Sequence, residues 1–136
     1  MATWEDVRRI SLALPDTTEA SSRGMPGWSV HEKAFAWERP LRRGDLEALG
    51  DDAPQGPILC AQVADVGAKE ALVADDPAVY FTTPHFNGYP AILMRIPTLA
   101  EIDREELHEL VVEAWLTRVQ RRIAKAWLAE NAPPDD

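Results

Sequence analysis

The side chains that could act as nucleophiles or general bases are few and scattered. His85 lies near Thr83 and Tyr89, and Ser22 is a conceivable nucleophile elsewhere. Nucleophilic catalysis needs a base within hydrogen-bond reach of the nucleophile and a third group that orients the base. The sequence has neither a Gly-x-Ser-x-Gly elbow nor a familiar Cys–His pair. We therefore expect a protein that is not an enzyme, in which His85 and Asn87 bond the backbone of a turn.

Metal and cofactor sites have no recognisable pattern either. His31, His85 and His108 are far apart, and no Cys-x-x-Cys or His-Glu-x-x-His spacing gathers ligands. The glycine-containing segment 24–27 lacks the lysine and the following Ser/Thr of a phosphate-binding loop. The sequence thus predicts neither a metal nor a cofactor. Cys60, the one cysteine, cannot form an internal disulfide, which favours a reducing compartment.

Basic side chains form two clusters that could contact nucleic-acid phosphates. The first cluster comprises Lys33, Arg39, Arg42 and Arg43, and the second comprises Arg118, Arg121, Arg122 and Lys125. Each cluster has a second interpretation that does not involve a ligand. Acidic residues directly follow the first, so it could be a solvated loop. The second lies toward the end of a predicted helix whose start is acidic, an arrangement that complements the helix dipole.

Aromatic residues suggest a third candidate site. We expect Trp28, Phe81 and Trp115 in the core, whereas other aromatic residues lie beside turns or strand ends. An exposed aromatic pocket beside basic side chains could bind a base, a peptide or a small anion. The candidate pocket residues are Trp37, His85, Asn87, Tyr89 and Arg95.

The elements that must position these residues follow from periodicity and from helix-end signals. Helices are predicted from the N-cap Thr3 to Leu14, over 66–74 after the N-cap Asp65, and over 103–130; strands are predicted over 28–30, 34–37, 58–63, 79–82 and 91–96. Residues 16–23 read as a polar link, and 40–57 as an extended charged loop with one helical turn capped by Asp45. The order predicts an α+β fold, α-β(3)-α-β(2)-α, with an antiparallel sheet and helices packed on one side.

Length and charge limit the protein class. A chain of 136 residues fits a single domain over 1–136, with 131–136 as a flexible tail. The net charge of −9 disfavours nucleic acid. It does not exclude a local basic patch, because charges beyond about 10 Å are screened at ~0.1 M salt. With no signal peptide and no apolar run of ~20 residues, we expect a soluble, cytoplasmic protein without a membrane partner.

Six short segments stand out by their order along the chain: Ala13–Pro15, Gly24–Pro26, Lys33–Ala36, Ala74–Pro77, Phe81–Pro90 and Ile92–Ile96. Together they resemble the MmcQ/YjbR family. The resemblance covers nearly the whole chain. It implies a YjbR-like, secretion-chaperone-like fold and a DNA-binding protein whose two hairpins act as a double wing. DNA binding would then be weak and salt-dependent. The alternative is a protein- or peptide-interaction module without nucleic-acid binding, as a monomer or weak homodimer.

Overall fold

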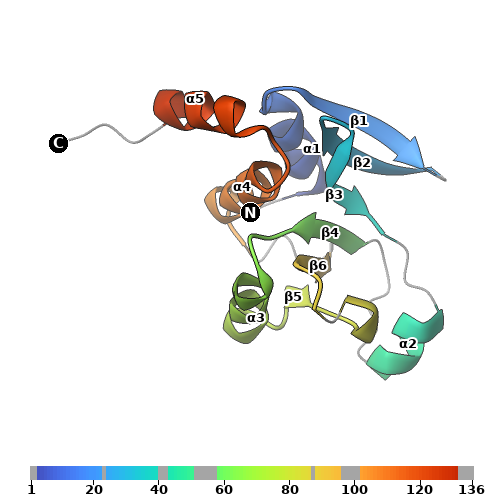
Figure 1. Cartoon of the computed structure of the whole chain (residues 1–136). Helices are drawn as coiled ribbons and strands as arrows, with labels where there is room; N and C mark the ends of the chain where they lie inside the picture. Colours follow the sequence, from blue (N-terminus) through green and yellow to red (C-terminus); the bar gives the residue numbers. More distant parts are fainter. Residues whose placement is uncertain are drawn as a thin grey trace.

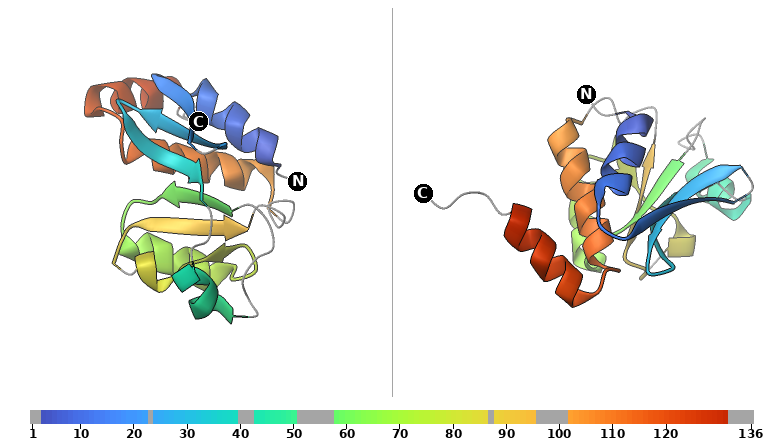
Figure 2. Two further views of the ribbon diagram at one scale, coloured as in Figure 1. Left: turned by 90° about the vertical axis from the view of Figure 1, so that its right-hand side faces the viewer. Right: turned by 90° about the horizontal axis from the view of Figure 1, so that it is seen from above.

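The computed structural model describes residues 3–22, 24–39, 43–50, 58–86, 88–95 and 102–131. These residues form a twisted antiparallel sheet with a layer of helices on one face (Figures 1 and 2). In that layer α1 (Trp4–Ala13) lies beside α4 (Arg104–Leu116), and α3 (Val66–Asp75) flanks α4 on its other side. The predicted α+β class and antiparallel sheet are confirmed. Within this part of the chain no helix is both long and apolar enough to cross a bilayer.

The sheet contains every predicted strand and one more. Its strands are β1 (Thr17–Ser22), β2 (Met25–Val30), β3 (Lys33–Glu38), β4 (Ile58–Gln62), β5 (Tyr80–Phe81) and β6 (Ala91–Arg95). Their spatial order is β1-β2-β3-β4-β6-β5, and all neighbours are antiparallel. The last strand in sequence therefore lies between β4 and the short edge strand β5.

Strand β1 corrects the prediction of a polar link over 16–23. The segment has no alternation of apolar residues, so its periodicity contains no strand signal. It becomes a strand because its full length pairs with β2. Glu19 of β1 also accepts hydrogen bonds from Trp28 Nε1 at 2.9 Å and from Arg8 Nε at 2.8 Å. These partners come from β2 and α1, and only the folded chain brings them to Glu19.

The hairpin predicted around His31 is confirmed and closes by a tight turn between β2 and β3. His31 and Glu32 have positive φ angles of 51° and 67°. Two such residues in succession match the twist of the flanking strands, as in type I′ hairpin turns. The turn leaves Lys33 exposed at the first residue of β3.

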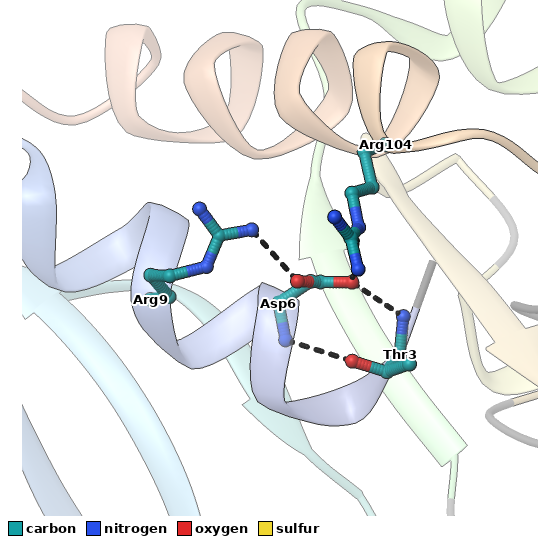
Figure 3. A network of polar contacts seen from close by, with 4 residues as sticks. All are labelled: Thr3, Asp6, Arg9 and Arg104. Carbon is teal, nitrogen blue, oxygen red and sulfur yellow. Dashed lines mark hydrogen bonds and ion pairs between the residues drawn. The ribbon is translucent and has the colours of Figure 1, made fainter. Parts of the chain in front are cut away.

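Helix α1 begins at a capping box that also binds α4 (Figure 3). Thr3 N donates to Asp6 Oδ2 at 2.9 Å, and Asp6 N donates to Thr3 Oγ1 at 3.2 Å. The Asp6 carboxylate is buried and lies 2.7 Å from Arg9 Nη2 and 3.4 Å from Arg104 Nε of α4. One carboxylate therefore caps the first helix and links it to the fourth.

This network predicts that the Asp6 carboxylate makes the free energy of unfolding fall at acid pH. The hydrogen bond from Arg9, together with those from Thr3, outweighs burial and lowers the pKa of Asp6 from 3.8 to about 2. Because the unfolded chain binds this proton more tightly, the stabilisation is complete above about pH 4 and is lost as the pH falls toward 2. We expect Asp6→Asn to be less stable than the wild type at pH 7 and to approach it at pH 2, in urea unfolding.

The control for this prediction is Glu5→Gln, which removes an exposed acid from the same helical turn. It should follow the wild-type pH dependence. An unchanged difference between Asp6→Asn and the wild type from pH 7 to about pH 2 would contradict the role assigned to the carboxylate.

The predicted single helix over 103–130 is wrong, because the structure breaks it into α4 and α5 (Arg121–Asn131). At the break, Thr117 Oγ1 donates to Ala114 O at 2.7 Å. The Trp127 ring packs edge-on against Trp115, with centroids 5.5 Å apart. In an unbroken helix these two residues would be separated by about 18 Å along the axis. The tryptophan contact therefore requires α5 to turn back, although no glycine or proline marks the position.

Two hydrophobic clusters occupy the two faces of the sheet. The larger lies under α1, α3 and α4 and includes Trp28 and Trp115, as predicted. The smaller comprises Ile58, Cys60, Phe81, Phe86, Ala91 and Leu93, with Trp37 and Leu49 packed against it. Leu49 belongs to the short helix α2 (Arg43–Leu49), and Phe86 to the 3-10 turn η2 (Pro84–Phe86). The main helices thus cover one face, while α2 and η2 cover part of the other.

Candidate functional site

A groove of about 470 Å³ runs between α3 and α4. Its apolar residues are Ala68, Ala71, Leu72 and Leu110, and its carboxylates belong to Asp75, Glu106, Glu109 and Glu113. On each helix the lining residues recur at intervals of three and four, so they share one face. The two alanines of α3 leave the space open, and the four carboxylates are exposed. The result is an apolar floor with a strongly acidic rim.

Tyr80 holds one part of this rim in place. Its hydroxyl donates to Glu106 Oε2 at 2.6 Å, and its ring is buried. Burial, reinforced by the hydrogen bond to Glu106, raises the pKa of Tyr80, so the phenol remains a donor at neutral pH. No lysine or arginine is among the described residues that line the groove. The sequence alone explains the acidic residues of α4 by the helix dipole, because the linear order does not show that α3 lies opposite them.

The second predicted basic cluster is divided between two environments. Arg121, Arg122 and Lys125 are exposed on α5, and none forms an ion pair with a residue that the structure describes. Arg118 instead lies in the turn between α4 and α5, where it is half-buried. The α5 residues form a basic surface, and Arg118 has a different role.

The described members of the first predicted basic cluster lie in different environments. Lys33 is exposed beside the β2–β3 turn. Arg43 is exposed on α2, with its Nε 3.3 Å from Glu47 Oε1. Arg42 lies outside the described residues. Lys33 thus belongs to β3 and Arg43 to α2.

Arg39 is buried, which corrects its assignment as a phosphate contact. Its Nη1 lies 2.9 Å from Asp45 Oδ2, and its guanidinium carbon lies 4.7 Å from the centroid of the Phe86 ring. Asp45, which the sequence predicts as a helix cap, is itself buried within the first turn of α2. A guanidinium enclosed by a carboxylate and a ring is not accessible to a phosphate. Its role is to fasten α2 to the end of β3.

Trp37 and Arg95, two residues of the predicted aromatic pocket, border the smaller hydrophobic cluster. Trp37 is half-buried and packs against that cluster. The guanidinium carbon of Arg95 lies 4.4 Å from the centroid of the Phe81 ring, and its Nη1 donates to Pro77 O and Ala78 O at 3.2 and 3.3 Å. The protein's own rings therefore occupy this face of the sheet. The side chain of His85 and all of Asn87 lie outside the described residues.

Tyr89 and Arg118, which the sequence placed in different candidate sites, meet at Gln62. With the Gln62 amide oriented to satisfy its neighbours, its oxygen accepts from Arg118 Nη2 at 3.0 Å and from the Tyr89 hydroxyl at 2.7 Å. Gln62 is buried, while the Tyr89 ring remains 40% exposed. This contact orders the turn between α4 and α5 against the sheet.

Lys69 of α3 has a structural role that the sequence did not indicate. Its ammonium is buried and donates to Phe86 O at 2.5 Å and to Tyr89 O at 3.1 Å. Burial lowers the pKa of Lys69. The cation satisfies two carbonyls of the motif that carries the family resemblance and connects that loop to α3.

Cys60, a potential nucleophile, lies in β4 at the interior of the protein. Cys60 is fully buried, and its burial raises its pKa to about 12, so it is a neutral thiol at physiological pH. The part of the chain that the structure describes contains no group of three or more His, Cys, Asp or Glu side chains placed to hold a metal ion.

The fold and these contacts define an α+β protein with an antiparallel sheet, a one-sided helical layer and a groove between two of its helices. The chain belongs to the YjbR family, whose model matches residues 12–117. The residues that suggested the resemblance are thus part of a real family relationship.

Three mycobacterial proteins are similar to this chain over almost its whole length. They are the uncharacterized proteins Rv2570 and MT2646 of Mycobacterium tuberculosis and Mb2600 of Mycobacterium bovis. Each is 50% identical over 134 residues, covering 96% of this chain and 99% of the relative. In the crystal structure of the Deinococcus radiodurans protein DR2400, whose domain is named DUF419, the fold is similar with a TM-score of 0.64. At 20% identity, over 100% of this chain and 92% of that one, this similarity concerns the fold alone.

Proposed function

We propose that the protein is a non-catalytic protein-interaction module and that its α3–α4 groove binds a basic amphipathic helix. The observation that carries this proposal is the apolar floor lined by four carboxylates without a facing cation among the described residues. Helix-in-groove recognition uses apolar side chains at intervals of three and four residues to fill such a floor. Flanking lysines or arginines would then meet the acidic rim. We place this interaction in the reducing cytoplasm, where Cys60 stays a thiol.

Charge repulsion within the groove supports a cationic partner. Glu106, Glu109 and Glu113 are separated by three and four positions on α4, a spacing at which like charges destabilise a helix by a few tenths of a kcal/mol per pair, about 0.2–0.5. A cationic helix would remove that repulsion and bury the floor at the same time. The negative charge of the whole chain would also accelerate association with a basic partner.

A fluorescein-labelled designed peptide of about 16 residues, with a leucine stripe and otherwise lysine and alanine, tests the proposal. We expect binding in fluorescence anisotropy with a Kd on the order of 1–100 µM at about 50 mM salt, weakening as salt rises. Glu109→Lys with Glu113→Lys should weaken it by about tenfold or more. Ala71→Trp, which fills the groove without changing its charge, should weaken it too.

The matched control is Glu32→Lys, which reverses an exposed charge in the β2–β3 turn and should leave the peptide affinity unchanged. A second peptide with the lysines replaced by glutamates should not bind. Equal peptide binding by the wild type, by Glu109→Lys with Glu113→Lys and by Ala71→Trp would contradict the proposal.

The second candidate function is weak DNA binding through α5. It is favoured by the exposed Arg121, Arg122 and Lys125, which have no acidic partner among the described residues. The same anisotropy titration with a labelled random duplex, at about 50 and 200 mM salt, decides it. Binding that falls steeply with salt and is lost in Arg121→Glu with Arg122→Glu supports DNA. No binding at tens of micromolar protein at the lower salt rejects it.

A further inference from the structure

We infer that the α3–α4 groove is occupied by α5 of a second copy of this chain, in a reciprocal homodimer. The inference rests on the proposed function of the groove as a helix-binding site and names its occupant. It is carried by two surfaces of opposite character on one molecule, each without a partner within the described residues: the acidic groove, and the outer face of α5.

The outer face of α5 has the features that the groove requires. Arg121, Lys125 and Leu128 are spaced by four and three residues, so they share one face of the helix. Leu128 is 48% exposed, the largest exposed fraction among the large hydrophobic side chains that the structure describes. The opposite face is engaged within the chain, because Ile123 and Trp127 pack against the main core. An apolar side chain that follows two cations along the same helix face is therefore exposed on the outer side of α5.

The charges of the two surfaces match. The three cations of α5 (Arg121, Arg122 and Lys125) would meet the four carboxylates of the groove, and Leu128 would reach its apolar floor. Two copies that each carry a net charge of −9 repel at long range. The contact therefore depends on local complementarity, and we expect a weak dimer, with a Kd on the order of 10–100 µM, that dissociates at high salt.

The arrangement of the helices is compatible with closed symmetry. α5, α4 and α3 lie along one side of the molecule, with α4 between the other two (Figure 1). The view from above shows α5 diverging from α4 on the same side (Figure 2). In a two-fold dimer each copy presents the same surfaces to the other. An axis beside α4 would place each α5 over the other copy's groove, so the assembly closes at two chains.

Sedimentation velocity on the full chain, at about 10–300 µM and about 50 or 500 mM salt, tests the inference. We expect the wild type to form a dimer at the lower salt and to be a 15.1 kDa monomer at the higher salt. A helix variant, Arg121→Glu with Lys125→Glu, and a groove variant, Glu109→Lys with Glu113→Lys, should each raise the Kd by about tenfold or more. An equimolar mixture of the two should regain dimers, because one contact of the mixed dimer pairs the two reversed surfaces and the other pairs two unchanged surfaces.

Lys33→Glu is the control, because it reverses an exposed charge outside both surfaces and should dimerise as the wild type does. A monomeric wild type at the highest concentration and lower salt overturns the inference, as does a mixture of folded variants that stays monomeric.

Peptide binding by the helix variant, whose groove is intact, separates the two proposals. If that variant binds the designed peptide while the wild type never dimerises, the groove function stands and the named occupant is wrong. A dimer insensitive to both variants also overturns the inference.

Discussion

Asp45→Ala is expected to lower the free energy of unfolding by about 3–5 kcal/mol, the cost of breaking a buried ion pair from one side. The side chains of Asp45 and Arg39 are 4% and 9% exposed, and the two groups lie 2.9 Å apart. Removing the carboxylate leaves the Arg39 guanidinium buried next to the Phe86 ring without this counter-charge. Urea unfolding followed by circular dichroism measures the change.

The same helix provides a matched control for that prediction. Arg43 and Glu47 of α2 form an ion pair whose side chains are 93% and 70% exposed. Glu47→Gln should therefore cost no more than about 1 kcal/mol. The double variant Arg39→Met with Asp45→Leu, which removes both charges, should recover most of the stability lost in Asp45→Ala. Equal effects of Asp45→Ala and Glu47→Gln would show that the buried pair has no special role.

This prediction also changes how a DNA-binding experiment on Arg39 should be interpreted. Substituting Arg39 removes this counter-charge from the buried Asp45, so a loss of DNA binding in such a variant would first reflect unfolding. Charge reversals at Arg121 and Arg122 avoid this difficulty, because both side chains are exposed on α5. DNA binding that is lost in those variants would assign the contact to α5, and DNA binding that persists would leave the hairpin wings as the candidate surface. Neither substitution disturbs the sheet.

Trp115→Ala is the second large expected effect, with a loss of about 3–5 kcal/mol in the free energy of unfolding. Trp115 is fully buried, its Nε1 donates to Pro15 O at 3.1 Å, and its ring packs edge-on against Trp127. The substitution leaves a cavity between α1 and α4 and removes the contact that directs α5. We expect lower urea stability together with faster amide hydrogen exchange across α5 than in the wild type.

Two substitutions on α5 test whether the loss of stability comes from core packing at Trp115 or would follow any substitution near this end of the chain. Trp127 is only half-buried, so Trp127→Ala should accelerate exchange in α5 while costing less overall than Trp115→Ala. Leu128 is exposed on the other face, so Leu128→Ala should stay within about 0.5 kcal/mol of the wild type. A Trp115→Ala protein as stable as Leu128→Ala would contradict the role of this residue in the core.

Much of the fold could be predicted because its signals are local. The N-caps Thr3 and Asp65 are confirmed, each accepting a hydrogen bond from the backbone three residues on. The turn at His31 and Glu32 joins the predicted strands. Such signals depend on residues only a few positions apart, so they can be recognised in the sequence without knowledge of the fold. The family relationship was visible for a similar reason, since its motifs are short segments in a recognisable order.

The linear pattern therefore suffices for the fold class, the starts of α1, α3 and α4, the hairpin and the principal core aromatics. The tertiary structure decided which charged groups are enclosed and which remain exposed: it buried Arg39 against Asp45 and placed Lys69 beneath the motif loop. It also paired a polar segment with β2 as β1, and turned α5 back onto Trp115. The acidic groove arises in the same way, because α3 and α4 are separated in the chain by β5, η2 and β6 and lie side by side only in the folded protein. Burial and charge pairing depend on distances in space, and a linear pattern does not contain those distances.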